Sequence, residues 1–80
     1  MRGRRIADGQ FHDASREPGD YGLCGRGLWL VLPTGRHARL NIERWTWTEE
    51  IDGTLTVSPS IFDTPAGWHG YLERGQWRSV

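Results

Sequence analysis

Residues 45–58, Trp45-Thr-Trp-Thr-Glu-Glu-Ile-Asp-Gly-Thr-Leu-Thr-Val-Ser58, alternate apolar and polar side chains on both sides of an Asp-Gly pair. A period of two is typical of a β-strand, whose successive side chains point to opposite faces. A three-residue loop at 51–53 is a common hairpin connection, because its final glycine accepts the left-handed conformation required there. This loop places Trp47 opposite Val57. A slip of one residue would mix the two faces, so the sequence predicts a hairpin in this register.

The predicted hairpin has one apolar and one hydroxyl-rich face. The simpler interpretation of the hydroxyl-rich face is a solvent-exposed sheet surface, where threonine has high β-propensity. The alternative is a flat polar interface with a partner or an identical subunit. We favour the exposed surface and leave the interface open. The side chains concerned are Thr46, Thr48, Thr54 and Thr56, with Glu50 and Ser58.

Other short segments also have strand character. The x-x-Gly pattern at 7–9 and at 73–75 predicts two more hairpins, 4–6 with 10–12 and 68–72 with 76–80, the latter with Tyr71 opposite Trp77. The apolar run 28–32, ended by Pro33, is typical of a strand buried on both faces and is predicted to be the centre of the sheet.

Helical spacing is not found in any segment free of glycine and proline. Residues 13–27, rich in glycine and charge, are predicted to form a long loop. The apolar parity changes between Ile42 and Trp45, which indicates a bulge near Arg44. We therefore predict an all-β fold, a small twisted antiparallel sheet or half-open barrel built from short hairpins.

The 80 residues predict a single domain, 1–80, with a thin supply of aliphatic side chains. The five tryptophans compensate, because each aromatic side chain buries roughly 150–250 Å². The residues predicted to form the core are Leu28, Leu30, Leu32, Leu40, Ile42, Trp45, Trp47, Leu55, Val57, Ile61, Tyr71 and Trp77.

The charge balance limits the class of partner. Ten basic and ten acidic residues give a net charge of zero, which argues against general nucleic-acid binding. No apolar run approaches the ~20 residues that span a membrane, and the basic N-terminus lacks the apolar segment of a signal peptide. The single cysteine excludes an internal disulfide. We expect a cytoplasmic protein, in the host cytoplasm if a phage encodes it.

A convergent catalytic set is not evident in the sequence. Cys24 and a histidine have the residue types of a nucleophile and a base, but no orienting group or oxyanion donor can be assigned to them. The adjacent Glu49 and Glu50 point to opposite faces of a strand. Tryptophan beside arginine is enriched at binding hot spots. The candidate contacts for a protein or small anionic ligand are Trp68, Arg44, Arg74 and Arg78.

The second half of the chain resembles a family of small bacterial and phage domains of unknown function. The resemblance covers roughly residues 22–77. It rests most on Ser58-Pro59-Ser60-Ile61, followed by His69 and Trp77. Some of these domains lie beside ubiquitin-like conjugation genes. Fuller members look zinc-binding, with several cysteines where this chain keeps Cys24 and His69. The resemblance therefore implies a metal-free relative, without a cofactor, in which tryptophan packing replaces a zinc staple.

These observations lead to three functional hypotheses. The first is a small non-enzymatic protein-interaction module, phage-encoded, that acts on a host or phage protein and forms homo-oligomers. The second is a protein that sequesters a nucleotide or other small ligand. The third is a zinc-binding structural domain that uses Cys24 and His69 with His12 or His37.

Overall fold

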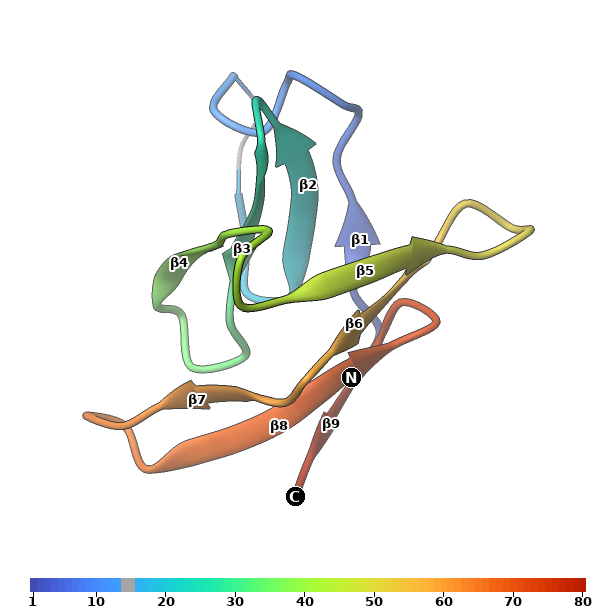
Figure 1. The fold of residues 1–80 in the computed structure, drawn as a ribbon. Coiled ribbons are helices and arrows are strands. Elements are labelled where there is room, and N and C mark those ends of the chain that lie inside the picture. The colour runs from blue at the N-terminus through green and yellow to red at the C-terminus, as the bar shows by residue number, and fades with distance from the viewer. Residues whose placement is uncertain (14–15) are drawn as a thin grey trace.

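The computed structural model describes residues 1–13 and 16–80. These residues form strands and turns without a helix, which confirms the all-β prediction (Figure 1). Accordingly, none of them belongs to a helix that could cross a membrane. The strands are β1 (Arg4–Arg5), β2 (Asp20–Cys24), β3 (Gly27–Val31), β4 (His37–Leu40), β5 (Thr46–Glu49), β6 (Leu55–Ser58), β7 (Ile61–Asp63), β8 (Trp68–Glu73) and β9 (Gln76–Ser79).

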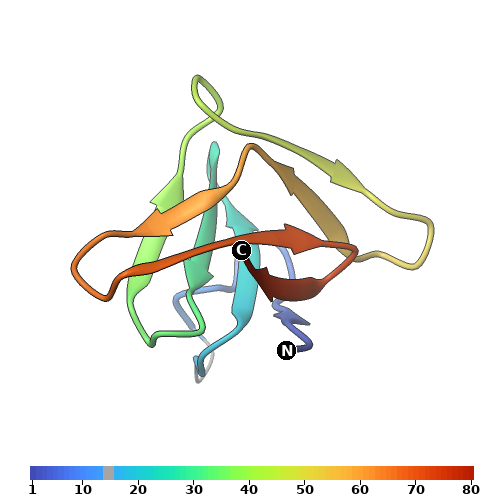
Figure 2. The same cartoon turned by 90° about the horizontal axis from the view of Figure 1, so that it is seen from below.

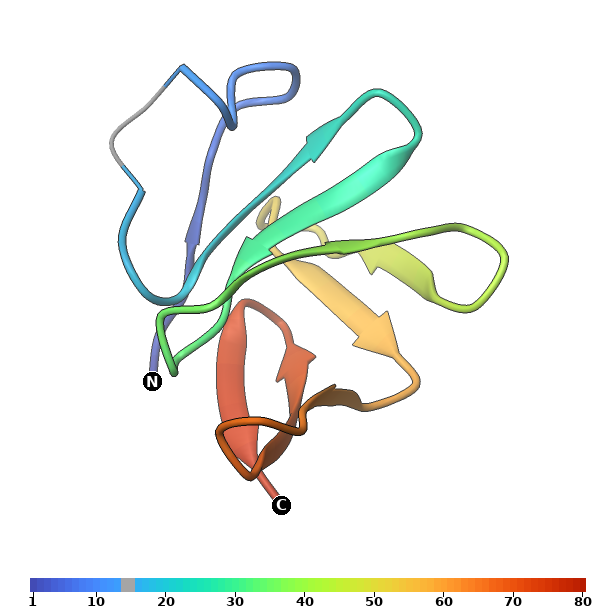
Figure 3. The same ribbon diagram turned by 90° about the vertical axis from the view of Figure 1, so that its left-hand side faces the viewer.

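The strands form three small sheets. The first has the order β1-β2-β3-β4, the second is the hairpin β5-β6, and the third has the order β7-β8-β9. All pairs are antiparallel except β1 with β2. Among the described residues no sheet closes into a barrel, so the small twisted sheet is the better of the two predicted forms. Figures 2 and 3 show β7–β9 lying across from the four-stranded sheet.

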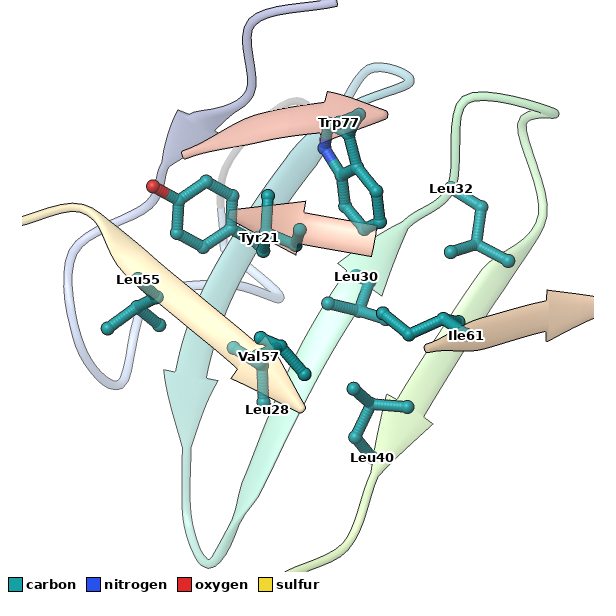
Figure 4. Packing of buried hydrophobic residues seen from close by; sticks show 10 residues of the cluster. Tyr21, Leu28, Leu30, Leu32, Leu40, Leu55, Val57, Ile61 and Trp77 are labelled. Carbon is teal, nitrogen blue, oxygen red and sulfur yellow. The ribbon is translucent and has the colours of Figure 1, made fainter. Parts of the chain in front are cut away.

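The core fills the space between the sheets. Side chains from β2, β3 and β4 meet those of β6, β7 and β9 (Figure 4). The strand β3 is central in its sheet, as predicted, with Leu28 and Leu30 fully buried. Trp45 and Trp47 are half-buried and pack against this cluster. The buried cluster consists of Tyr21, Leu28, Leu30, Leu32, Leu40, Leu55, Val57, Ile61, Leu72 and Trp77.

The hairpin β5-β6 has the predicted register. Trp47 lies opposite Val57, and Thr48 lies opposite Thr56. Glu50 donates its backbone N–H to the carbonyl of Thr54, which closes the three-residue loop. The separation of an apolar from a hydroxyl-rich face was therefore sufficient to fix this register.

The predicted register of the last hairpin was wrong by one residue. Arg74 and Gly75 both have positive φ, 48° and 73°, and form a two-residue turn between Glu73 and Gln76. Two successive left-handed residues define the type I′ turn, whose twist matches that of the flanking strands. Tyr71 consequently lies opposite Arg78, on the outer face, and is not a core residue. Leu72 takes the predicted place of Tyr71 in the core.

The N-terminal third also differs from the prediction. Residues 4–6 do not pair with 10–12; instead β1 pairs in parallel with β2, which lies inside the stretch 13–27 predicted to be a loop. Residues 14 and 15 of that stretch lie outside the described residues. Ile6, Phe11 and Val31 form a second small core cluster that was not predicted.

The predicted bulge near Arg44 is absent from the described structure, because β4 and β5 do not form one continuous strand. The Asn41 side-chain oxygen accepts the backbone N–H groups of Glu43 and Arg44, and this turn redirects the chain. Ile42 lies in the turn and is 57% exposed, which corrects its assignment to the core.

The strands β7 and β8 place three ring side chains on the outer face of their sheet. Ile61 and Asp63 of β7 are buried, so Phe62 between them points outward. In β8, Gly70 and Leu72 are buried, whereas His69 and Tyr71, which alternate with them, are partly exposed. Both outward sets lie on one face of the β7-β8-β9 sheet.

Candidate active site

Ser60 and His69 form a hydrogen-bonded pair on the outer face of the third sheet. The Ser60 Oγ lies 2.6 Å from His69 Nε2 in a partly buried position. Ser60 directly precedes β7, and the β7-β8 register places Phe62 opposite His69. Antiparallel pairing therefore brings together two side chains that are nine residues apart in the chain.

The imidazole of His69 packs against an aromatic ring and not against an acidic side chain. The Phe62 ring stacks on it, with centroids 3.9 Å apart and an interplanar angle of 8°. The Tyr71 ring lies further along the strand, 6.3 Å away. Within residues 1–13 and 16–80, no carboxylate contacts the imidazole. The ring orientation consequently depends on Ser60 and Phe62.

The backbone of Ser60 is fixed on one side and open on the other. Its carbonyl accepts the indole N–H of Trp45 at 3.4 Å. Its own N–H has no hydrogen-bond partner in the part of the chain that the structure describes. In serine proteases the N–H of the nucleophilic serine is one of the donors that bind the oxyanion. The Ser60 N–H is therefore a candidate for this role.

The nearest acidic residue in the sequence, Asp63, faces the opposite side of β7. Its side chain is 1% exposed and accepts hydrogen bonds from Thr34 Oγ1 and Arg36 Nε, each at 2.7 Å. The Thr34 hydroxyl and the Arg36 guanidinium lower the pKa of this carboxyl, against burial that raises it. Asp63 thus joins β7 to the loop before β4 and is not the partner of His69.

The structure brings together two of the four predicted binding residues. Arg74 and Arg78 line an open pocket of about 530 Å³ on the same outer face. Arg78 forms an ion pair with Glu73, and its guanidinium carbon lies 5.7 Å from the Tyr71 ring centroid. The pocket is completed by Glu50, Thr56, Glu73 and Gln76.

The other two predicted contacts lie elsewhere. Trp68 is half-buried, with its indole N–H donated to Ser79 Oγ at 3.0 Å and its ring edge against Trp77. Arg44 is exposed in the turn after β4. Neither lines the pocket that contains Arg74 and Arg78. Their binding role stays a prediction.

The two remnant metal-ligand candidates lie in different sheets. Cys24 ends β2 and packs against the second core cluster, whereas His69 is in β8 beside Ser60. In the described ranges, no three His, Cys, Asp or Glu side chains are grouped to hold a metal ion. The chemistry on the outer face is therefore that of a hydroxyl and an imidazole.

A serine hydroxyl within hydrogen-bond distance of an imidazole nitrogen is the nucleophile and base pair of the serine hydrolases. The chain belongs to a family described as bacterial ubiquitination-like system serine protease (BubE), whose model matches residues 21–80. No curated protein and no solved structure shows significant similarity to the chain.

The family match corrects the central functional prediction. A non-enzymatic interaction module is contradicted, because the family is that of a serine protease. The resemblance to a bacterial family is confirmed at this level, while phage origin and cytoplasmic location stay predictions. Ser60 was not predicted as a nucleophile, although the motif Ser58-Pro59-Ser60-Ile61 with His69 already contained both residues. Cys24 was the one nucleophile that the residue types suggested.

Proposed function

We propose that this chain is a serine protease of a bacterial ubiquitination-like system, with Ser60 as nucleophile and His69 as general base. The distance of 2.6 Å between Ser60 Oγ and His69 Nε2 carries the proposal. The family description supports both the reaction and the system.

The chemistry follows from this pair. His69 Nε2 accepts the Ser60 proton as Oγ attacks the carbonyl carbon of the scissile amide. The Ser60 N–H points to the developing oxyanion, and the imidazolium then gives its proton to the leaving amine. The product of this half is an ester between Ser60 and the acyl part of the substrate. Water, deprotonated by His69, hydrolyses the ester and restores the hydroxyl.

The pocket with Arg74 and Arg78 is the proposed extension of the substrate site. His69, Tyr71 and Glu73 follow one another on the same face of β8, and Glu73 lines the pocket. At about 3.3 Å per residue, Glu73 lies roughly 13 Å from His69.

A covalent probe tests the nucleophile directly. A small fluorophosphonate should label the wild-type protein once, and mass spectrometry of the digest should place the label on Ser60. Ser60→Ala should abolish labelling, and His69→Gln should slow it by about 10²–10⁴-fold, the usual contribution of a general base. Ser58→Ala is the matched control, because Ser58 is an exposed hydroxyl two residues away and should leave labelling unchanged. Labelling that persists in Ser60→Ala would refute the proposal.

A further inference from the structure

At Phe62 the outer edge of β7 has no hydrogen-bond partner in the described part of the chain. β7 pairs with β8 on one side. Of the described strands, β8 alone has Cα atoms within 8 Å of those of β7. A hydrogen-bonded neighbour would lie 4.7–4.9 Å away. No described strand therefore pairs with the second edge.

The backbone polar groups of Phe62 face this free edge. The carbonyl of His69 accepts the N–H of Val80, so the polar backbone groups of His69 point toward β9. Because antiparallel partners alternate between bonded and non-bonded pairs, His69 and Phe62 form a non-bonded pair. The close approach of side chains in such pairs agrees with the stacked rings of these two residues. The N–H and C=O of Phe62 consequently point away from β8.

The open part of this edge ends at the dyad, where the Ser60 carbonyl accepts the Trp45 indole N–H and the Ser60 N–H has no partner among the described residues. Ser60 lies two residues before Phe62, a separation of roughly 6.5 Å along an extended chain. A peptide residue that pairs with Phe62 thus has its next two residues beside Ser60. The opposite edge of this sheet does not offer such a site, because Met1 and Gly3 already bond to Trp77 and Gly75 there.

We propose that the edge of β7 binds the substrate as an added β-strand, with the Phe62 N–H and C=O bonded to the main chain of the substrate. This inference rests on the proposed function and specifies the substrate as an extended, unfolded peptide segment. Main-chain pairing gives affinity with little dependence on side chains. The 64% exposed Phe62 ring offers a large apolar contact beside the pairing site. A folded surface without a free strand cannot enter this edge.

Two substitutions at position 62 separate the backbone from the ring. Phe62→Pro removes the ring and the outward N–H, and proline is tolerated on edge strands because its missing N–H is not part of the ladder. Phe62→Ala removes the ring alone. Labelled casein, an unstructured protein, serves as the strand-forming substrate, and p-nitrophenyl acetate as one that cannot form a strand.

The Pro variant should cleave casein about five- to tenfold more slowly than the Ala variant in kcat/KM, the worth of about 1–1.4 kcal/mol for one hydrogen bond. Both variants should hydrolyse p-nitrophenyl acetate equally. Equal casein cleavage by the two variants would overturn the edge site. Unequal ester hydrolysis would show that proline disturbs the dyad, and the following measurement would then decide.

Amide hydrogen exchange of Ser60→Ala provides that independent measurement. Exchange at the Phe62 N–H should slow by at least fivefold when unlabelled casein is added in excess. Unchanged exchange would refute the proposal whatever the proline variant does. Protection that is already present without casein and grows with protein concentration would assign the edge to a second copy, and would also refute it. Failure of fluorophosphonate labelling would reject the proposed protease function separately, because labelling does not require strand pairing.

Discussion

The His69 imidazole lies between the Ser60 hydroxyl and the face of the Phe62 ring. In the familiar triad a buried aspartate orients the histidine and stabilises the imidazolium that forms during attack. An aromatic face also attracts a cation through its quadrupole. Phe62 therefore partly orients His69 and partly stabilises the imidazolium. It acts as a positioning residue and not as a catalytic one.

Replacing this ring tests its role. Phe62→Leu keeps an apolar side chain but removes the π face, and should lower kcat for p-nitrophenyl acetate roughly two- to fivefold with little change in KM. The size follows from ~0.5–1 kcal/mol for an exposed cation–π contact. Phe62→Tyr should restore kcat, because its ring has the same face. A change in KM with kcat unaltered, or a kcat that tyrosine does not restore, would contradict a role in orienting His69.

The contact between Ser60 and His69 could not be predicted from the sequence. Ser60 and His69 both lie in a recognisable motif, but the motif does not state that they touch. Their contact depends on the pairing of β7 with β8, and β7 is only three residues long. A strand this short has too few side chains to show alternation. The motif therefore contained both residues, but the sequence predicted neither Ser60 as a functional residue nor the site.

The strand β8 has to approach β9 closely at Gly70. A Cβ atom at this position would collide with the carbonyl oxygen of Arg78 and would lie 2.5 Å from the Trp68 ring. The indole of Trp68 thus covers the space that a side chain would occupy. Only glycine fits between this ring and β9, and the fit sets the path of the strand that carries His69.

Gly70→Ala should destabilise the protein by about 1–3 kcal/mol, the usual cost of overpacking a tight site. It should also reduce fluorophosphonate labelling, because His69 is the neighbouring residue. Urea unfolding followed by tryptophan fluorescence measures the first effect. Gly27→Ala is the control: its Cβ would meet the Arg39 side chain, which can move, so its cost should be smaller. Equal midpoints for the two variants would show that Gly70 is not under steric constraint.

Hairpin register was predictable where two faces differ in polarity. Trp47 opposite Val57 followed from the separation of apolar and hydroxyl side chains. The last hairpin has the same x-x-Gly pattern, yet its turn uses Arg74 in the left-handed region, which non-glycine residues seldom occupy. Residue type alone does not reveal that choice. The one-residue error moved Tyr71 from the predicted core to the outer face.

The arrangement of the three sheets depends on contacts between residues far apart in the chain. Arg5 of β1 bonds Glu49 of β5 at 2.9 Å and the carbonyl of Gly53 at 2.7 Å. Asp63 of β7 bonds Thr34 and Arg36 across the core. Local patterns predicted most strands, but no local pattern contains these long-range pairs. The parallel pairing of β1 with β2 escaped prediction for the same reason.

Asp63 makes the stability of the whole molecule depend on pH. Hydrogen bonds from Thr34 and Arg36 lower the pKa of its carboxyl below the ordinary value of about 3.9. A carboxyl with a lowered pKa in the folded state contributes stability above its unfolded pKa and loses it as the pH falls through the folded value. The wild-type protein should therefore lose stability below about pH 4.

Asp63→Asn removes this contribution. The variant should unfold at lower urea concentration than the wild type at pH 7 and at pH 5, and the two midpoints should converge toward pH 2. Asp13→Asn is the matched control, because Asp13 is exposed and its carboxylate has no partner in the described part of the chain. The difference in urea midpoint between wild type and Asp63→Asn could instead stay constant from pH 7 to pH 2. In that case the shape of the Asp63 side chain, and not its ionisation, would be what stabilises the protein. Because the same side chain anchors β7, the loss of its charge should also slow labelling of Ser60 at pH 7.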